Sequence, residues 1–72
     1  MAKIKVWFDE EADFLEVNFA KRKGHLREIA PDVYERVDSK GRILGFAIFN
    51  FLKQPRKTVE IPFEETKLAL GR

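Results

Sequence analysis

The stretch Asp9–Asp13, DEEAD, holds the densest group of side chains that could do chemistry, with four carboxylates in five residues. Paired carboxylates catalyse proton transfer when their environments separate their pKa values, and carboxylate oxygens also bind hard cations such as Mg²⁺. A short exposed turn offers neither burial nor convergence. We therefore interpret DEEAD as a structural turn, in which Asp9 accepts from the N–H groups that follow it and Asp13 does so at the next strand, with Glu10 in solvent. A metal or acid–base site and a partner contact are the alternatives.

The rest of the chain contains few reactive groups. His25 is the lone histidine, and Ser39 is the lone serine and falls in a predicted turn, so neither has an evident catalytic partner. The absence of cysteine excludes a disulfide, a thiolate metal site and a cysteine nucleophile. We expect no catalytic residue, no metal and no cofactor, and hence a protein that is not an enzyme.

Basic residues form a second candidate site, which is divided between two predicted loops: Lys21, Arg22 and Lys23 in one, and Lys53, Arg56 and Lys57 in the other. If the loops lie on one edge, they offer a phosphate-binding patch, and nearby aromatic side chains could stack on single-stranded RNA. The alternative is a pair of solvated loops. The 14 basic and 12 acidic residues leave a net charge of +2, which does not require a nucleic-acid partner.

Length and composition predict a small cytoplasmic protein. The chain has 72 residues, of which 44% are hydrophobic and 12% aromatic, so it is apolar enough to fold as one domain with little stability in reserve. The absence of cysteine is typical of a reducing compartment. The longest apolar run, around Phe46–Phe49, is far too short to span a membrane, and Met1–Lys5 does not lead into a signal-peptide core.

Apolar residues alternate with period two along most of the chain, which is typical of strands with two distinct faces. We predict strands over Lys3–Phe8, Phe14–Phe19, Val33–Asp38 and Arg42–Phe51, and extended segments over Arg27–Ala30 and Thr58–Phe63. DSKGR, with Asp38 at its start and Gly41 free to take positive φ, predicts a hairpin. Glu64–Leu70 is long enough for about two helical turns. The predicted fold class is β-rich α+β, an antiparallel β-meander of about four strands with a short C-terminal strand or helical segment.

The predicted strand Arg42–Phe51 is apolar on both faces, and both must be covered. Strict alternation places Leu44, Phe46 and Ile48 on one face and Ile43, Ala47, Phe49 and Phe51 on the other. Trp7, Phe14 and Tyr34 extend the second face into a patch of the size that marks interfaces. Either the segment Thr58–Leu70 folds over this patch, or a second copy or another protein covers it.

Two motifs resemble the DUF2283 (YuzE-like) family of small proteins of unknown function. Phe8, Asp9, Glu11, Ala12 and Asp13 match its aromatic–Asp-x-Glu-Ala-Asp motif, and Asp38, Gly41, Arg42 and Gly45 match its hairpin and the glycine in the following strand. The resemblance covers about residues 3–51 of a single domain, 1–72, and leaves 55–72 as an extension. Ala47 and Asn50–Phe51 are less acidic than that stretch of the family. The resemblance implies an antiparallel sheet of about four strands, no established catalytic residues and a prokaryotic source, and some relatives resemble antitoxin partners of small toxins.

Two hypotheses of function follow. The first is a non-enzymatic interaction module that forms a homodimer or binds a small protein partner, through aromatic and apolar side chains typical of binding hot spots: Trp7, Phe14, Tyr34, Ile43, Ala47, Phe49 and Phe51. The second is a nucleic-acid module that uses the two basic loops, whose affinity would fall steeply with salt.

Overall fold

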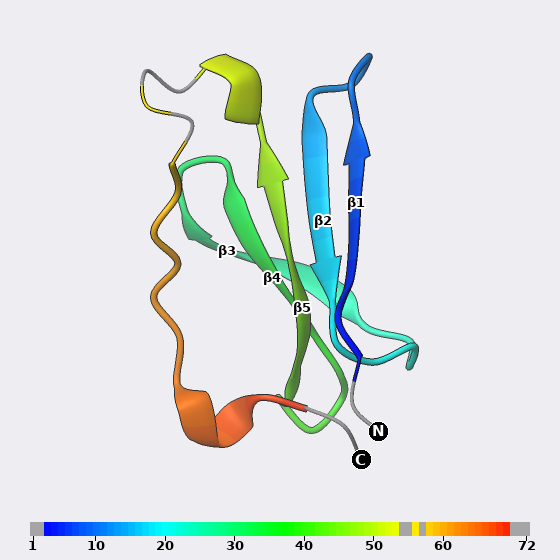
Figure 1. The fold of residues 1–72 in the computed structure, drawn as a ribbon. Helices are drawn as coiled ribbons and strands as arrows, with labels where there is room; N and C mark the ends of the chain where they lie inside the picture. The colour runs from blue at the N-terminus through cyan, green and yellow to red at the C-terminus, as the bar shows by residue number, and fades with distance from the viewer. Residues whose placement is uncertain (1–2, 54–55, 57, 70–72) are drawn as a thin grey trace.

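The computed structural model describes residues 3–53, 56 and 58–69 of the chain. They form one sheet of five strands and two short 3-10 turns. The elements are β1 (Lys5–Asp9), β2 (Phe14–Asn18), β3 (His25–Ala30), β4 (Val33–Val37), β5 (Ile43–Phe49), η1 (Phe51–Lys53) and η2 (Glu65–Lys67). The order across the sheet is β1-β2-β5-β4-β3, and each neighbouring pair is antiparallel (Figure 1).

The prediction of a β-rich antiparallel sheet is confirmed, with two corrections. The sheet has five strands rather than four, because His25–Ala30 pairs with β4 along its length as a full strand. The predicted C-terminal helix is reduced to the single 3-10 turn η2, since so short a segment cannot repay helix nucleation. Leu68 instead forms a parallel bridge to Ile43, and Leu70, the last residue of the predicted helix, lies outside the described residues.

A bulge in the central strand β5 decides which side chains share a face. Arg36 lies opposite Gly45 and Val37 lies opposite Ile43, so Leu44 is an extra residue in β5. A bulge of this kind reverses the alternation beyond it. Ile43 therefore joins the side of Phe46 and Ile48, whereas strict alternation predicted it on the opposite face.

The face that carries Ile43 is the core of the protein, and we call it the core face. Its buried residues are Val33, Val37, Ile43, Phe46 and Ile48. Phe51 also packs against this cluster, not on the second face where alternation had placed it, because the chain turns at Asn50, whose φ is 57°, before η1 begins. Two of the seven predicted interface residues thus belong to the core face.

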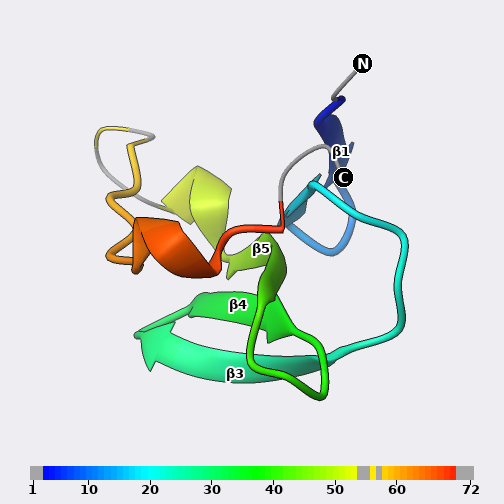
Figure 2. The ribbon, with the colours of Figure 1, turned by 90° about the horizontal axis from the view of Figure 1, so that it is seen from below.

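The C-terminal segment 58–69, which we call the tail, covers the core face. Val59, Ile61 and Leu68 pack against the core cluster, and the Ala69 N–H donates to the Ile43 carbonyl at 2.9 Å. Figures 1 and 2 show the tail along one side of β5, with β1 at the edge of the sheet away from it. The tail therefore leaves uncovered the opposite face, which carries Ala47 and Phe49.

The close approach of β2 to β5 at Gly45 provides a test of this packing. A Cβ added at Gly45 would press into the Val17 carbonyl oxygen and lie 2.8 Å from Asn18 Oδ1. We predict that Gly45→Ala lowers the free energy of unfolding by about 2 kcal/mol or more, measured by urea denaturation.

Gly41→Ala is the control, because its Cβ would meet nothing within 4 Å and only its φ of 80° opposes the change. It should cost about 1 kcal/mol. An equal or smaller loss for Gly45→Ala than for Gly41→Ala would contradict the packing described.

Candidate interaction surface

Four aromatic rings from neighbouring strands form a continuous row on the face opposite the core face. Trp7 of β1 contacts Phe14 of β2 edge-on, with ring centroids 5.9 Å apart. Phe14 lies 4.9 Å from Phe49 of β5, and Phe49 lies 5.4 Å from Tyr34 of β4 in an edge-on arrangement. We call these four residues the aromatic surface. Such contacts add about 0.5–1.5 kcal/mol each beyond the burial of area, so ring contacts stabilise the row.

Ala47 lies beside this row on β5, opposite Glu16 on one neighbouring strand and Tyr34 on the other. Only 1% of Ala47 is exposed, because the larger side chains on both sides shield its methyl group. Five of the seven predicted interface residues, Trp7, Phe14, Tyr34, Ala47 and Phe49, thus share one face, but Ala47 has almost no surface to offer a partner.

The other half of the same face is polar and is organised by Arg36. Its Nε donates to Asn18 Oδ1 at 3.0 Å, and Asn18 Nδ2 donates to Glu16 Oε1 at 2.8 Å. The two remaining guanidinium nitrogens donate to the carbonyls of Ala20 and Arg22. Arg36 therefore fastens the loop that leads from β2 across this end of the sheet to β3. The period-two pattern places Arg36 on this face, but its loop partners depend on a connection that the pattern does not reveal.

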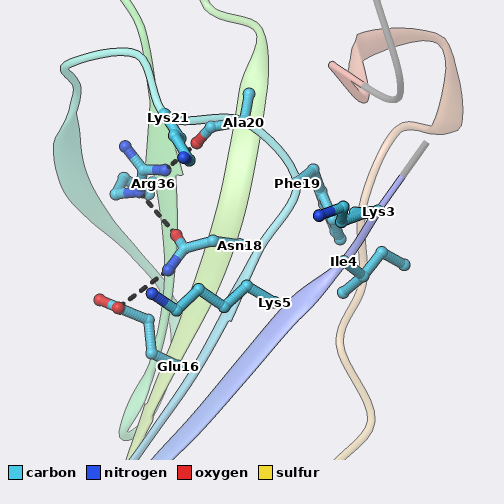
Figure 3. A pocket seen from close by; sticks show the side chains of 9 residues that line it. All are labelled: Lys3, Ile4, Lys5, Glu16, Asn18, Phe19, Ala20, Lys21 and Arg36. Atoms are coloured by element: carbon cyan, nitrogen blue, oxygen red, sulfur yellow. Dashed lines mark hydrogen bonds between the residues drawn. The ribbon is translucent and has the colours of Figure 1, made fainter. Parts of the chain in front are cut away.

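An open cavity borders this network, and its lining residues include Lys3, Lys5, Lys21 and Arg36. Figure 3 shows Lys5, Glu16, Asn18 and Arg36 on one side of the strands, while Lys3, Ile4 and Phe19 lie on the other. Three N–H groups of Arg36 donate to the loop and to Asn18, and Lys3 lies on the other side of the strands from Lys5 and Arg36, so these cations do not converge on one point as an anion site requires.

The two basic loops lie at opposite ends of the sheet. Lys21–Lys23 follows the end of β2, where Asn18 pairs with Gly45 near the start of β5. Lys53 and Arg56 follow the other end of β5, beyond Phe49 (Figure 1). Lys57 lies outside the described residues. The described basic residues of the two loops therefore do not form the single patch that the nucleic-acid hypothesis requires.

The two aspartates of DEEAD, Asp9 and Asp13, accept backbone hydrogen bonds. Asp9 Oδ1 accepts from the N–H groups of Glu11 and Ala12 at 3.1 and 3.2 Å, as the turn interpretation expects, and Glu10 is exposed. Asp13 differs from expectation: its Oδ1 accepts from the Leu52 N–H at 2.8 Å and so ties the turn to η1 instead of to β2. Within the described residues, no group of three or more histidine, aspartate or glutamate side chains is placed to hold a metal ion.

Strand β1 is the most exposed apolar element of the described chain. Val6 and Trp7 of β1 are 61% and 49% exposed, and Ile4, directly before the strand, is 57% exposed; these three make up half of the six exposed large apolar residues in the described chain. β1 is also an edge strand, so among the described residues no strand pairs with its outer side. β1 therefore combines exposed apolar side chains on both faces of the sheet with an open hydrogen-bonding edge.

A partly buried ion pair beside the tail was not predicted from the sequence. Glu35 is only 3% exposed and pairs with the half-exposed Arg27 of β3, beside a cavity bordered by the tail residues Phe63 and Lys67. Glu35 has the same parity in β4 as the core residues Val33 and Val37, and this spacing was the available signal. The pair allows a carboxylate to lie on an otherwise apolar face.

The fold and this surface define a small antiparallel β-sheet protein with one covered and one open face. Comparison with known families identifies its family: the chain belongs to DUF2283, a family of proteins of unknown function, whose model matches residues 5–51. The match covers all five strands and ends before the tail. No curated protein and no solved structure matches the chain significantly. Among the described residues, none belongs to a helix of the length and apolarity that crossing a membrane demands.

Asp38 organises the hairpin between β4 and β5. Its Oδ1 accepts from the N–H groups of Lys40 and Arg42, both at 2.9 Å, and its Oδ2 lies 3.3 Å from Arg42 Nε. The Arg42 N–H bond is the main cause that lowers the pKa of Asp38 below its ordinary 3.8, with the Lys40 N–H and the charges of Arg42 and Arg22 adding to it against desolvation. The ionised carboxylate is therefore the form that the folded hairpin favours.

We predict that Asp38→Asn, which keeps the acceptor oxygen but removes the charge, is less stable than the wild type at neutral pH. A lowered pKa in the folded state stabilises the protein above the unfolded pKa, and this contribution is lost as the pH falls through the folded pKa. Urea denaturation at neutral pH and near pH 2 should show the difference shrinking in acid. A difference that is independent of pH would contradict the role given to the charge.

Proposed function

We propose that this protein is a non-enzymatic interaction module that forms a homodimer, with the apolar residues of strand β1 and the adjoining end of the aromatic surface in the contact. The observation that carries the proposal is the concentration of exposed apolar side chains at an edge strand: Val6 and Trp7 lie in β1, and Ile4 directly precedes it. The tail covers the core face but lies away from β1, so about half or more of each of these side chains stays exposed in the described chain.

The size of the domain supports self-association. A chain of 72 residues buries only about 60% of the surface that its unfolded form exposes, so a second copy that buries further apolar area adds stability by mass action. Trp7 is the residue type most enriched among binding hot spots, and its packing against Phe14 holds it ready for contact.

Other functions receive less support from the arrangement of the residues. Asp9 and Asp13 of DEEAD accept hydrogen bonds from backbone N–H groups, and the described parts of the basic loops lie apart. We therefore do not propose a catalytic or nucleic-acid function. The proposal places the protein in the cytoplasm of a prokaryotic cell, in keeping with a sequence that contains no cysteine and with the resemblance described above.

We predict that the purified protein is dimeric at micromolar to millimolar concentration and that Trp7→Arg weakens the dimer by about thirty-fold or more, the effect of losing a hot-spot residue. Sedimentation equilibrium over a dilution series measures the change. Leu52→Arg is the matched control, because Leu52 is 44% exposed, close to the 49% of Trp7, but lies in η1. The control should leave the dimer intact.

Two results would count against the proposal. A wild-type protein that stays monomeric at every concentration removes the homodimer, and equal weakening by Trp7→Arg and Leu52→Arg removes the role of β1. Circular dichroism of each variant verifies that the sheet remains folded. If the monomer is captured only together with a second, different protein, the module binds a heterologous partner in place of its own copy.

A further inference from the structure

We propose that the dimer forms by edge-to-edge pairing of β1 with β1 of a second copy, antiparallel and with Trp7 opposite Trp7, so that two five-stranded sheets become one sheet of ten strands. The inference rests on the proposed homodimer and specifies how it is built. It follows from the directions of the backbone groups, the charges of β1 and the contrast between the two edges of the sheet.

The hydrogen-bond pattern determines which backbone groups of β1 point outward. The Phe19 N–H donates to Leu44 and the Asn50 N–H donates to Asp13, so the odd-numbered residues from 13 to 19 turn their backbone groups toward β5. The even-numbered residues of β2 therefore turn toward β1, where their partners are Lys5, Trp7 and Asp9. The N–H and C=O groups of Val6 and Phe8 consequently point away from β2, into the open edge.

A two-fold axis through Trp7 satisfies these outward groups. In that register Val6 of one copy lies opposite Phe8 of the other, and each such pair exchanges two hydrogen bonds, which gives four in the dimer. The two Trp7 residues form the intervening pair that makes no hydrogen bonds, in which side chains approach most closely. Their rings join two aromatic rows into one.

Charge also favours this register. Strand β1 reads Lys5-Val6-Trp7-Phe8-Asp9, and the axis through Trp7 places Lys5 of each copy opposite Asp9 of the other. Opposite charges in directly facing positions stabilise a strand pair, and this register alone pairs all five residues of the strand. A register centred on Val6 or Phe8 leaves one strand end unpaired and separates these charges.

The other edge of the sheet is protected against the same pairing. Strand β3 has a bulge between Glu28 and Ala30, carries His25, Arg27 and Glu28, and is followed by Pro31. Bulges, charged side chains and proline are features that keep an edge strand from pairing with a strand of another chain. Two-fold pairing at β1 leaves only the protected β3 edges at the two ends of the dimer. The assembly therefore stops at the dimer and does not extend into a filament.

Residue-resolved amide hydrogen exchange of the wild-type protein, measured by NMR at concentrations below and above the dimer midpoint, tests the pairing. We expect the Val6 and Phe8 amides to exchange at least about ten-fold more slowly in the dimer than in the monomer. The Leu26 amide of β3 serves as the internal reference and should not change.

The outcomes separate this inference from the proposed function. A dimer in which Val6 and Phe8 exchange as fast as in the monomer overturns the edge pairing and leaves the homodimer standing, since face-to-face packing covers side chains without bonding the edge. A protein that shows no dimer at any concentration overturns both.

Charge reversal at Lys5 gives a second test of the register. Lys5→Glu places a second carboxylate opposite Asp9 of the other copy, and we expect the dimer to weaken by about five-fold, with less effect at high salt. Lys40→Glu is the matched control, because Lys40 is also an exposed lysine but lies in the hairpin between β4 and β5, away from β1. Equal weakening by the two variants would contradict the Lys5–Asp9 pairing. Urea denaturation of each monomer verifies that both remain folded.

Discussion

The central strand β5 is apolar on both faces, and the rest of the structure depends on how each face is covered. The bulge at Leu44 collects Ile43, Phe46 and Ile48 on one side, and the tail closes over that side. On the other side, Gly45 lets β2 approach closely, Arg36 fastens the crossing loop, and aromatic rings fill the remaining half. The two faces are therefore stabilised differently, one by burial under the tail and the other by ring contacts that remain partly open to solvent.

The family match includes the sheet but not the segment that covers one of its faces. DUF2283 covers residues 5–51, which include the whole sheet and its motifs, whereas the tail that covers the core face lies beyond the match. The motif residues have clear structural roles, since Asp9 and Asp38 accept backbone N–H groups in the two hairpins and Gly45 permits close strand approach. The shared features thus specify the turns and the strand pairing of the sheet.

The features that could be predicted from the sequence are those determined by interactions between residues close together in the chain. The DEEAD turn, the Asp38–Gly41 hairpin and the antiparallel strands around them depend on residues close together in the chain, whose side chains and conformational preferences are visible in the pattern. The long-range features were not predictable in the same way. The bulge at Leu44 arises from pairing with β4, and the capping of Leu52 by Asp13 joins residues 39 positions apart. Each depends on register, and a shift of one residue reverses every face.

Alternation brought five aromatic and apolar candidates to one face but placed Ile43 and Phe51 there as well. Neither the bulge nor the turn after β5 changes the local pattern of apolar residues, so the pattern could not exclude these two. The separation of the basic loops follows from strand order, which period-two alternation does not contain.

Small-angle X-ray scattering of the wild-type protein at high concentration tests the central claim most directly, because it reports mass and shape together. The account predicts a particle of twice the 8.5 kDa of the chain, elongated across the strands, whose scattering matches two sheets joined at β1. A particle of monomer mass, with the compact dimensions of 34 × 23 × 18 Å, would contradict the account, and so would a compact dimer with the sheets packed face to face.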